Sequence, residues 1–420
     1  MLLIKKAKVI CENSAYNNKQ VDILIKDGRI SEIGTGLKFE GRTLELPNLH
    51  VSLGWFDAFA QVGEPGLEQC ETFESFQKAA SAGGFTRVGV VPNTKPALHS
   101  KTELRYVIES NQQSAVRLMP YGALTKNCEG KDFAEIYDLE HAGALAFTDG
   151  KQGIADSGLM LRSLQYVKPF KGLVMQTPQC KSLTSHGQMH EGECSTRLGT
   201  PGIPSIAETT IVERDLQLLQ YAESRLHFNH ISTAESVEII RKAKAAGQAV
   251  TASVAVLNLL FTDDAIGSFD VNFKVLPPLR SQTDRAALIE GLKDGTIDFI
   301  DSNHIPLEIE EKECEFSYAG FGAINLQTAF SVALEALSPS FNLGELVACF
   351  TTRPAKVLGL PIGTFAEGEP AELTFFNPEQ GYTFSQAINQ SKSKNSPLFG
   401  RQMQGQVYGI FNNNQLIINK

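Results

Sequence analysis

Apolar and polar positions alternate with a two-residue period at both ends of the chain. Near the N-terminus, LLIKKAKVI and VDILIKDGRISEIG flank a polar stretch, and Asp27-Gly28 interrupts the alternation in the way a tight hairpin turn does. Near the C-terminus, AELTFFNP and GQVYGIFNNNQLIIN repeat the pattern, with Asn412 to Asn414 at the turn. The pattern predicts a small composite β-sandwich domain made of residues 1–50 and 363–420.

The long middle of the chain, residues 51–362, follows a different pattern. Short runs rich in β-branched residues alternate with helical segments such as ESFQKAASAGG, STAESVEIIRKAKAAG and TDRAALIEGLKDG. The eight runs are LHVSLGWFDA (49–58), TRVGVVP (86–92), VRLMPYGAL (116–124), ALAFTD (144–149), GLVMQTP (172–178), RLHFNHI (225–231), AVTASVAV (249–256) and IDFIDSNH (297–304). Eight strands alternating with helices predict an α/β fold, a (β/α)8 TIM barrel, whose functional side chains lie at the carboxyl ends of the strands.

Composition narrows the class of protein further. The 420 residues are 42% hydrophobic and 20% charged, enough for a barrel and a smaller companion domain. The net charge is −9 without a basic stripe, so nucleic acid is not an expected partner. The apolar runs are too short to span a bilayer, and the N-terminus lacks the pattern of a signal peptide. The seven cysteines form no CxxC pair and are typical of reduced thiols. We therefore expect a soluble, cytoplasmic protein that forms a homo-oligomer.

Several segments of the chain resemble one family in the same order. They are EPG (64–66), AGGFTRVGVVPNTKP (82–96), PYGALTK (120–126), EGECSTRLGTPGIP (191–204), LHFNHISTAESVEIIRKAKAAG (226–247), PPLRS (277–281), EGLKDGTID (290–298) and TTRPAKVLGLP (351–361). Together they resemble bacterial dihydroorotases over nearly the whole chain. The resemblance implies a zinc amidohydrolase scaffold of pyrimidine synthesis, whose active members interconvert carbamoyl aspartate and dihydroorotate.

The metal positions that the resemblance implies are mostly occupied by other residue types. The two histidines of the family's Asp-x-His-x-His motif fall at Phe59 and Gln61, and the histidine of strand five falls at Thr177. An aromatic ring has no lone pair for zinc, and an amide oxygen is a poor substitute for imidazole. The aspartate of strand eight, both ligand and general base in the family, falls at Asn303, whose amide cannot take a proton from water.

Two metal positions keep a possible ligand. His230 matches the family histidine of strand six, and Asp149 matches the bridging carboxylate, although which member of the family's usual aspartate pair it represents stays open. Each also has an ordinary structural explanation. His230 is equally suited to hydrogen bonding inside the barrel mouth, and Asp149 to capping a turn through its side-chain oxygen. They are the only weak candidates for a metal ligand, and we expect no zinc.

The substrate positions implied by the resemblance are also altered. The arginine that precedes Glu-Pro-Gly in the family is Gly63, the asparagine before Pro-Pro-Leu-Arg is Leu276, and the second histidine of Asp-His-Ala-Pro-His is Leu307. Only Asn93 is kept. Without the arginine, the site lacks a bidentate clamp for a substrate carboxylate.

These substitutions favour a dihydroorotase-like protein without catalytic activity, kept as a binding or assembly partner. Inactive members of the family associate with aspartate transcarbamoylase, which is therefore the first candidate partner. The alternative is an active cyclic amidohydrolase with a mononuclear or metal-free site. A separate possibility is a metal site of His186, His190 and Cys194, whose four-residue spacing would place them on one face if the segment were helical.

Overall fold

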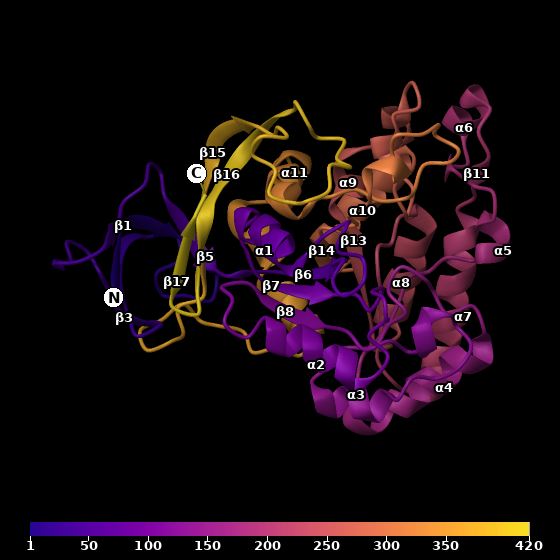
Figure 1. Cartoon of the computed structure of the whole chain (residues 1–420), viewed down its shortest axis with the longest axis horizontal. Coiled ribbons are helices and arrows are strands. Elements are labelled where there is room, and N and C mark those ends of the chain that lie inside the picture. Colours follow the sequence, from indigo (N-terminus) through magenta and orange to yellow (C-terminus); the bar gives the residue numbers. More distant parts are fainter. Residues whose placement is uncertain (420) are drawn as a thin grey trace.

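Seven parallel strands and one bridging segment form a closed barrel in the computed structural model, which describes residues 1–419 (Figure 1). The strands are β6 (Trp55–Ala60), β7 (Phe85–Val90), β8 (Arg117–Pro120), β9 (Val174–Gln176), β12 (Leu226–Phe228), β13 (Val250–Ala255) and β14 (Phe299–Asp301). They pair in two groups, β6-β7-β8 and β14-β13-β12-β9. A parallel bridge between Ala60 and His304 joins β6 to the end of β14. The predicted TIM barrel is confirmed.

Two of the eight predicted strands differ from the prediction. Residues 144–149 form no regular strand, but Phe147 bridges Gly122 on one side and Val174 on the other, and so fills the fourth position of the barrel. Residues 49–58 are two strands in two different sheets, β5 (His50–Leu53) and β6, separated at Gly54. A Cβ at Gly54 would lie 2.2 Å from Thr86 Oγ1, so the close approach of the two sheets requires glycine there.

The helices surround the barrel and follow the predicted pattern. The three helices expected from the sequence are present as α1 (Phe73–Ala82), α8 (Ala234–Ala245) and α10 (Gln282–Asp294). Ser281 caps α10 at its start, and Gly295 ends it with a φ of 83°. The others are α2 (Lys101–Ser110), α3 (Ile136–Ala142), α4 (Ser157–Val167), α5 (Lys181–Thr184), α6 (Glu193–Leu198), α7 (Ile206–Ala222), α9 (Val256–Leu260), α11 (Ala329–Leu337), α12 (Leu343–Ala348) and α13 (Thr352–Val357). No helix among residues 1–419 is long and apolar enough to cross a membrane.

The two ends of the chain together build one eight-stranded sheet beside the barrel (Figure 1). Its order is β17-β16-β15-β5-β1-β2-β3, with β4 paired to β1. The remaining bounds are β1 (Leu2–Val9), β2 (Gln20–Lys26), β3 (Arg29–Gly34), β4 (Thr43–Leu44), β15 (Leu373–Thr383), β16 (Gln402–Asn412) and β17 (Gln415–Ile418), and the short pair β10 (Met189–His190) and β11 (Gly202–Ile203) lies outside both sheets. The composite arrangement is confirmed, as one continuous sheet. The division at residues 50 and 363 stays a prediction.

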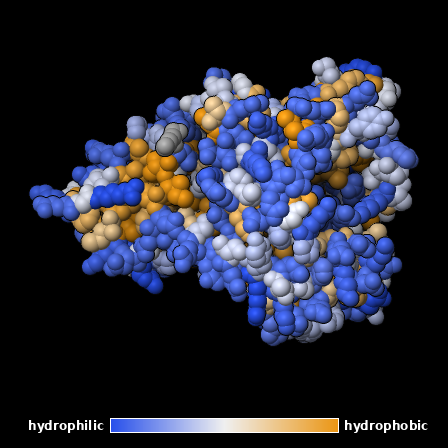
Figure 2. Space-filling model, in the orientation of Figure 1, coloured by the Kyte–Doolittle hydropathy of each residue, from blue (hydrophilic) through white to orange (hydrophobic). Residues whose placement is uncertain are grey.

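Both predicted hairpin turns are present in this sheet. Asp27 and Gly28, between β2 and β3, have φ of 50° and 74°, and Asn413 and Asn414, between β16 and β17, have φ of 49° and 59°. Two consecutive residues with positive φ are the signature of a type I′ turn, which glycine, asparagine and aspartate tolerate best. Figure 2 shows hydrophobic residues gathered over this sheet, on a face that is otherwise mostly hydrophilic.

Candidate functional site

His230 lies at the carboxyl end of the barrel between an aromatic ring and a carboxylate. The ring of Phe59, from β6, meets the imidazole edge to face with centroids 4.2 Å apart and an interplanar angle of 77°. On another side, Nε2 of His230 lies 2.7 Å from Oδ1 of Asp301, the last residue of β14. Phe59 is 2% exposed and His230 is 3% exposed. The imidazole is therefore enclosed by protein groups on both sides.

A second carboxylate lies close to this contact. Asp57 and Asp301 are both fully buried, and Asp57 Oδ1 accepts a hydrogen bond of 2.7 Å from the backbone N–H of Ser302. Burial, and then the nearby negative charge of Asp301, raise the pKa of Asp57 well above its ordinary value. Two neighbouring carboxylates and a histidine thus share the inside of the barrel mouth.

Two other metal positions implied by the resemblance hold neutral side chains bonded to nearby protein groups. Thr177 donates its hydroxyl to the carbonyl oxygen of Gly150 at 2.7 Å. Asn303 donates from Nδ2 to the carbonyl oxygen of Leu276 at 3.0 Å. Both side chains therefore donate hydrogen bonds to backbone carbonyl oxygens of the loops at the barrel mouth.

The backbone at two of the ligand positions is unusual. His230 has a φ of 56° and Asn303 a φ of 46°, both in the left-handed region that few non-glycine residues adopt. Residues in such conformations cluster at functional sites, because the surrounding fold must hold them there. The strand ends thus keep the special backbone geometry although the side chain at 303 is an amide.

Gln61 and Asn93 occupy neighbouring positions at the ends of β6 and β7. Gln61 Nε2 contacts the carbonyl oxygen of Asn93 at 3.5 Å, while Gln61 Oε1 is buried without a hydrogen-bond partner among the described residues. The Asn93 amide is occupied by backbone groups: Nδ2 donates to the Asp149 carbonyl, and Oδ1 accepts from the Lys151 N–H. Asn93 therefore shapes the loop after Asp149.

Asp149 binds Thr125, in the segment that follows β8. Its Oδ1 accepts a 2.9 Å hydrogen bond from the N–H of Thr125, and its Oδ2 accepts one from the Thr125 hydroxyl. Burial raises the pKa of Asp149 to about 6, although the bonds from Thr125 oppose the shift. The next residue is Gly150, so this position carries no second carboxylate. Its φ is 65°, and a Cβ there would lie 1.9 Å from Asn93 Oδ1, which leaves no room for a side chain.

The substrate positions implied by the resemblance are closed as well. A Cβ at Gly63 would lie 2.2 Å from the Leu67 carbonyl oxygen and 2.3 Å from that of Glu71, so the turn leaves no room for an arginine. Leu307 is 8% exposed and packs in the same apolar cluster as Phe59. The cavity that Leu276 lines with Thr177 and His230 has a volume of about 20 Å³. That is room for about one water molecule, whereas small-molecule sites are about 300–1,000 Å³.

Two further polar residues of the mouth were missed by sequence reasoning. Asp301 could have been suspected as an acidic residue inside the apolar run IDFID. Glu71 carries no such signal, because its partners come from distant segments: His304 Nε2 lies 3.5 Å away, and the Lys392 N–H donates to it at 3.0 Å. Burial opposes ionisation of Glu71, but the bonds from His304, Lys392 and Ser391 hold its pKa below the ordinary value.

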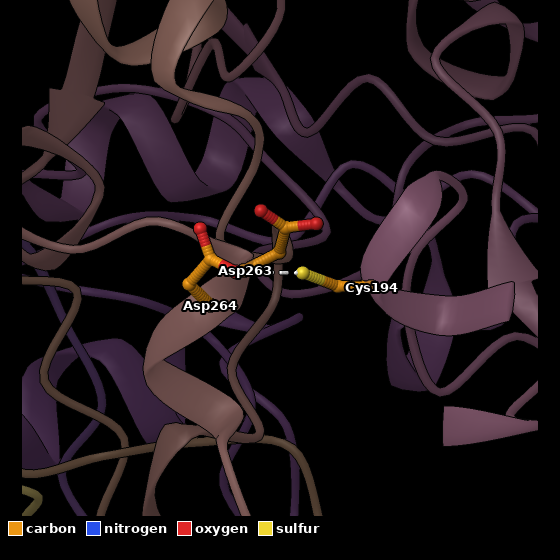
Figure 3. Close-up of side chains that lie close together, drawn as sticks. All are labelled: Cys194, Asp263 and Asp264. Atoms are coloured by element: carbon orange, nitrogen blue, oxygen red, sulfur yellow. Dashed lines mark hydrogen bonds between the residues drawn. The ribbon is translucent and has the colours of Figure 1, made fainter. Parts of the chain in front are cut away.

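The donors present at the mouth do not fit a binuclear zinc centre. Phe59 offers no lone pair, Asn303 offers only a neutral amide oxygen in place of a carboxylate, and the hydroxyl of Thr177 is donated to the Gly150 carbonyl oxygen. Among residues 1–419, the one group of three or more histidine, cysteine or acidic side chains with ligand atoms within 4.8 Å of one another lies elsewhere, at Cys194, Asp263 and Asp264 (Figure 3).

The possible metal site of His186, His190 and Cys194 is not built on one helix face. The segment is not one helix, because His190 lies on β10 and Cys194 on α6. His190 Nδ1 pairs with Arg280 Nη1 at 3.1 Å. Cys194 instead donates its thiol to Asp264 at 2.9 Å, and burial together with this bond raises its thiol pKa to about 12. A protonated thiol is a poor metal ligand.

A closed parallel barrel with its polar residues at the carboxyl strand ends, beside a sheet made from both termini, defines an amidohydrolase-type protein. The family model described as "Dihydro-orotase-like" matches residues 46–236, and the model "Amidohydrolase family" matches residues 201–414. A dihydroorotase of Syntrophus aciditrophicus is 37% identical over 412 residues, which cover 97% of this chain and 96% of that protein. A dihydroorotase of Pelotomaculum thermopropionicum is 38% identical and covers 96% of both.

Solved structures agree on the fold. The L-hydantoinase of Arthrobacter aurescens superposes with a TM-score of 0.86 at 23% identity, covering 100% of this chain and 96% of the other. A D-hydantoinase gives a TM-score of 0.83 at 20% identity. The chain belongs to the dihydroorotase-like branch of the amidohydrolase family.

Proposed function

We propose that this chain is a dihydroorotase-like protein of pyrimidine synthesis that binds a partner and does not hydrolyse a cyclic amide. The observation that carries the proposal is the contact between Phe59 and His230 at the position of the family's metal pair. Nε2 of His230, the imidazole kept at these positions, lies 2.7 Å from Asp301 Oδ1 and so already faces a carboxylate. A water bound there lacks both the Lewis acid that zinc supplies in the family and a basic group at 303 to take its proton.

The positions where the family resemblance implies substrate contacts support the same proposal. A mouth cavity of about 20 Å³ is too small for a dihydroorotate-sized ligand. An arginine at position 63 would require the turn from Gly63 to Glu71 to open. Reactivation would therefore need changes in the backbone as well as in the ligands.

The partner we propose is aspartate transcarbamoylase, and we propose that this chain acts in its assembly and is itself a homo-oligomer. The support is the intact scaffold: the barrel is closed, Ser281 caps α10, and the termini together build one eight-stranded sheet. A folded barrel that does not catalyse a reaction can still offer a surface to which a partner protein binds. Co-purification at native expression tests the idea, and an eluate free of any transcarbamoylase would count against it.

The second candidate is an active cyclic amidohydrolase. Its support is the similarity to relatives named dihydroorotase over nearly their full length. Asp57, Asp301 and His230 are titratable groups gathered inside the mouth that could serve a mononuclear or metal-free reaction.

One experiment separates the two candidates. The purified chain and the Syntrophus relative are assayed side by side for dihydroorotate hydrolysis and for zinc content after dialysis. We expect the relative to turn over substrate and this chain to show neither turnover nor stoichiometric zinc. Turnover by this chain within about 1–10³ s⁻¹, the ordinary range of enzymes, would establish the second candidate and end the first.

A further inference from the structure

A pocket between the barrel and the sheet lies at the amino ends of the barrel strands, opposite to His230. It has a volume of about 300 Å³, within the range of small-molecule sites. Its floor is buried and apolar, made by Phe56, Ala355 and Phe365, which are 2%, 6% and 1% exposed. Its rim carries the exposed residues Arg117 and Ile362. The space is thus a solvent-accessible pocket at a domain junction, where ligand sites are common.

Two arginines stand next to one another on the barrel side of this pocket. Arg87 of β7 and Arg117 of β8 are direct partners in the parallel register, so their side chains leave the sheet on the same face. Arg87 is neutralised by Glu372 of the sheet, which accepts from its Nε at 2.6 Å and also from Nη2. Glu372 accepts a further bond from the Thr86 hydroxyl, at 2.7 Å.

Arg117 has no such partner. Within residues 1–419, no carboxylate lies within 4.0 Å of its guanidinium, and it makes no hydrogen bond. Arg117 therefore carries an uncompensated positive charge beside the neutralised Arg87, and an anion at the pocket would be attracted to it. A guanidinium binds a carboxylate through two parallel hydrogen bonds.

The other charges of the pocket restrict the ligand further. Glu369 lines the pocket from the sheet side, and its Oε1 accepts only a 3.4 Å bond from Thr364. A second negative charge on the ligand would approach this carboxylate. We propose that this pocket binds a small organic monocarboxylate, with its carboxylate on Arg117 and an apolar body over Phe56, Ala355 and Phe365.

Benzoate is a suitable probe, with benzamide as its uncharged counterpart. Calorimetric titration of the full chain is expected to give saturable benzoate binding with a Kd of about 1 mM or tighter. Benzamide is expected to bind at least about tenfold more weakly, because it cannot form the charged pair. Inorganic phosphate, which lacks an apolar body, is expected not to compete at equal concentration.

Two exposed substitutions test the placement without disturbing the core. Arg117→Gln removes the charge, and Ile362→Glu adds a repelling charge at the rim; each is expected to weaken benzoate binding about tenfold. Arg105→Gln, on the exposed face of α2, is the control and keeps the wild-type Kd. Absence of saturable binding up to about 10 mM, equal binding of benzamide or phosphate, or an unchanged Kd in Arg117→Gln would each overturn the proposal.

Discussion

Phe59 and His230 meet edge to face with their ring centroids 4.2 Å apart, and Asp301 lies 2.7 Å from Nε2 of the same imidazole. A buried imidazole without polar partners loses the hydrogen bonds that it would make in water. Asp301 supplies a partner on one side, and Phe59 fills the space on another. The pair explains how a strand end built for metal ligands is stable with an aromatic ring in place of one ligand.

Truncating the ring tests its structural role. Phe59→Ala removes a fully packed side chain, so we expect the free energy of unfolding to fall by about 3–5 kcal/mol. Phe59→Leu keeps most of the volume and is expected to cost less than about 1.5 kcal/mol. Urea unfolding followed by circular dichroism measures both, with Phe269→Ala, at a 42% exposed side chain, as the control. Equal midpoints for Phe59→Ala and wild type would show that the ring does not stabilise the mouth.

The raised pKa of Asp149 predicts a dependence of stability on pH. The carboxyl group binds its proton more tightly in the folded state, where its pKa is about 6, than in the unfolded chain, where its pKa is the ordinary 3.8 of an aspartate. Its contribution is therefore present below about pH 4 and is lost as the pH rises to about 6. Two pKa units at about 1.4 kcal/mol each give a loss of about 3 kcal/mol.

Asp149→Asn removes this titration while keeping an oxygen for the Thr125 N–H. We expect the unfolding free energy of the variant, relative to wild type, to rise by about 3 kcal/mol between about pH 4 and pH 7. Urea unfolding at several pH values measures the difference, and Asp132→Asn, at an exposed aspartate of the segment between β8 and α3 that contains Thr125, should leave the profile unchanged. Parallel profiles for Asp149→Asn and wild type would contradict the assignment.

The crowded turn after β6 predicts a steric effect at Gly63. Even a methyl group there would meet the carbonyl oxygens of Leu67 and Glu71, which belong to the backbone and cannot move aside freely. Gly63→Ala is expected to lower the unfolding free energy by about 1–3 kcal/mol. Gly381→Ala is the matched control, since its added Cβ has only one neighbour, at 3.7 Å. A Gly63→Ala protein as stable as the control would mean that the turn opens readily.

The fold could be predicted from the sequence because local signals agreed with one another. Asp27-Gly28, Gly295 and the alternating runs each specify an element locally, and the eight runs together specify the barrel. The run at 144–149 was expected to be a regular strand but is not one, because Phe147 contributes only single bridges to its neighbours. The break at Gly54 depends on contacts with Thr86 and Glu372, which spacing does not reveal.

The site was predictable only in part, for a similar reason. Matching segments located Phe59, His230 and Asn303, whose places follow from strand order. The contacts of those residues come from segments far apart in the chain, as with Asp301 on His230 and the Lys392 backbone on Glu71. The four-residue spacing of His186, His190 and Cys194 does not place them on one helix face, because a helical period has meaning only where a helix forms.

Restoring the ligands separates metal binding from catalysis. The variant Phe59→His, Gln61→His, Thr177→His, Asn303→Asp returns the imidazoles and the carboxylate that the family resemblance implies. Tight zinc binding depends chiefly on the number and type of ligands. We therefore expect the variant to retain zinc after dialysis, measured by atomic emission, where wild type retains none.

The same variant is expected to remain inactive on dihydroorotate. Gly63 still provides no guanidinium for the substrate carboxylate, Leu307 still closes the apolar cluster, and the turn at 63–71 still fills the space. Since Asp301 competes with zinc for His230, adding Asp301→Ala should increase the zinc retained without producing turnover. A folded variant that binds no zinc would show that ligand loss is not what prevents metal binding. Turnover on restoring the ligands alone would show that the substrate site had been intact all along.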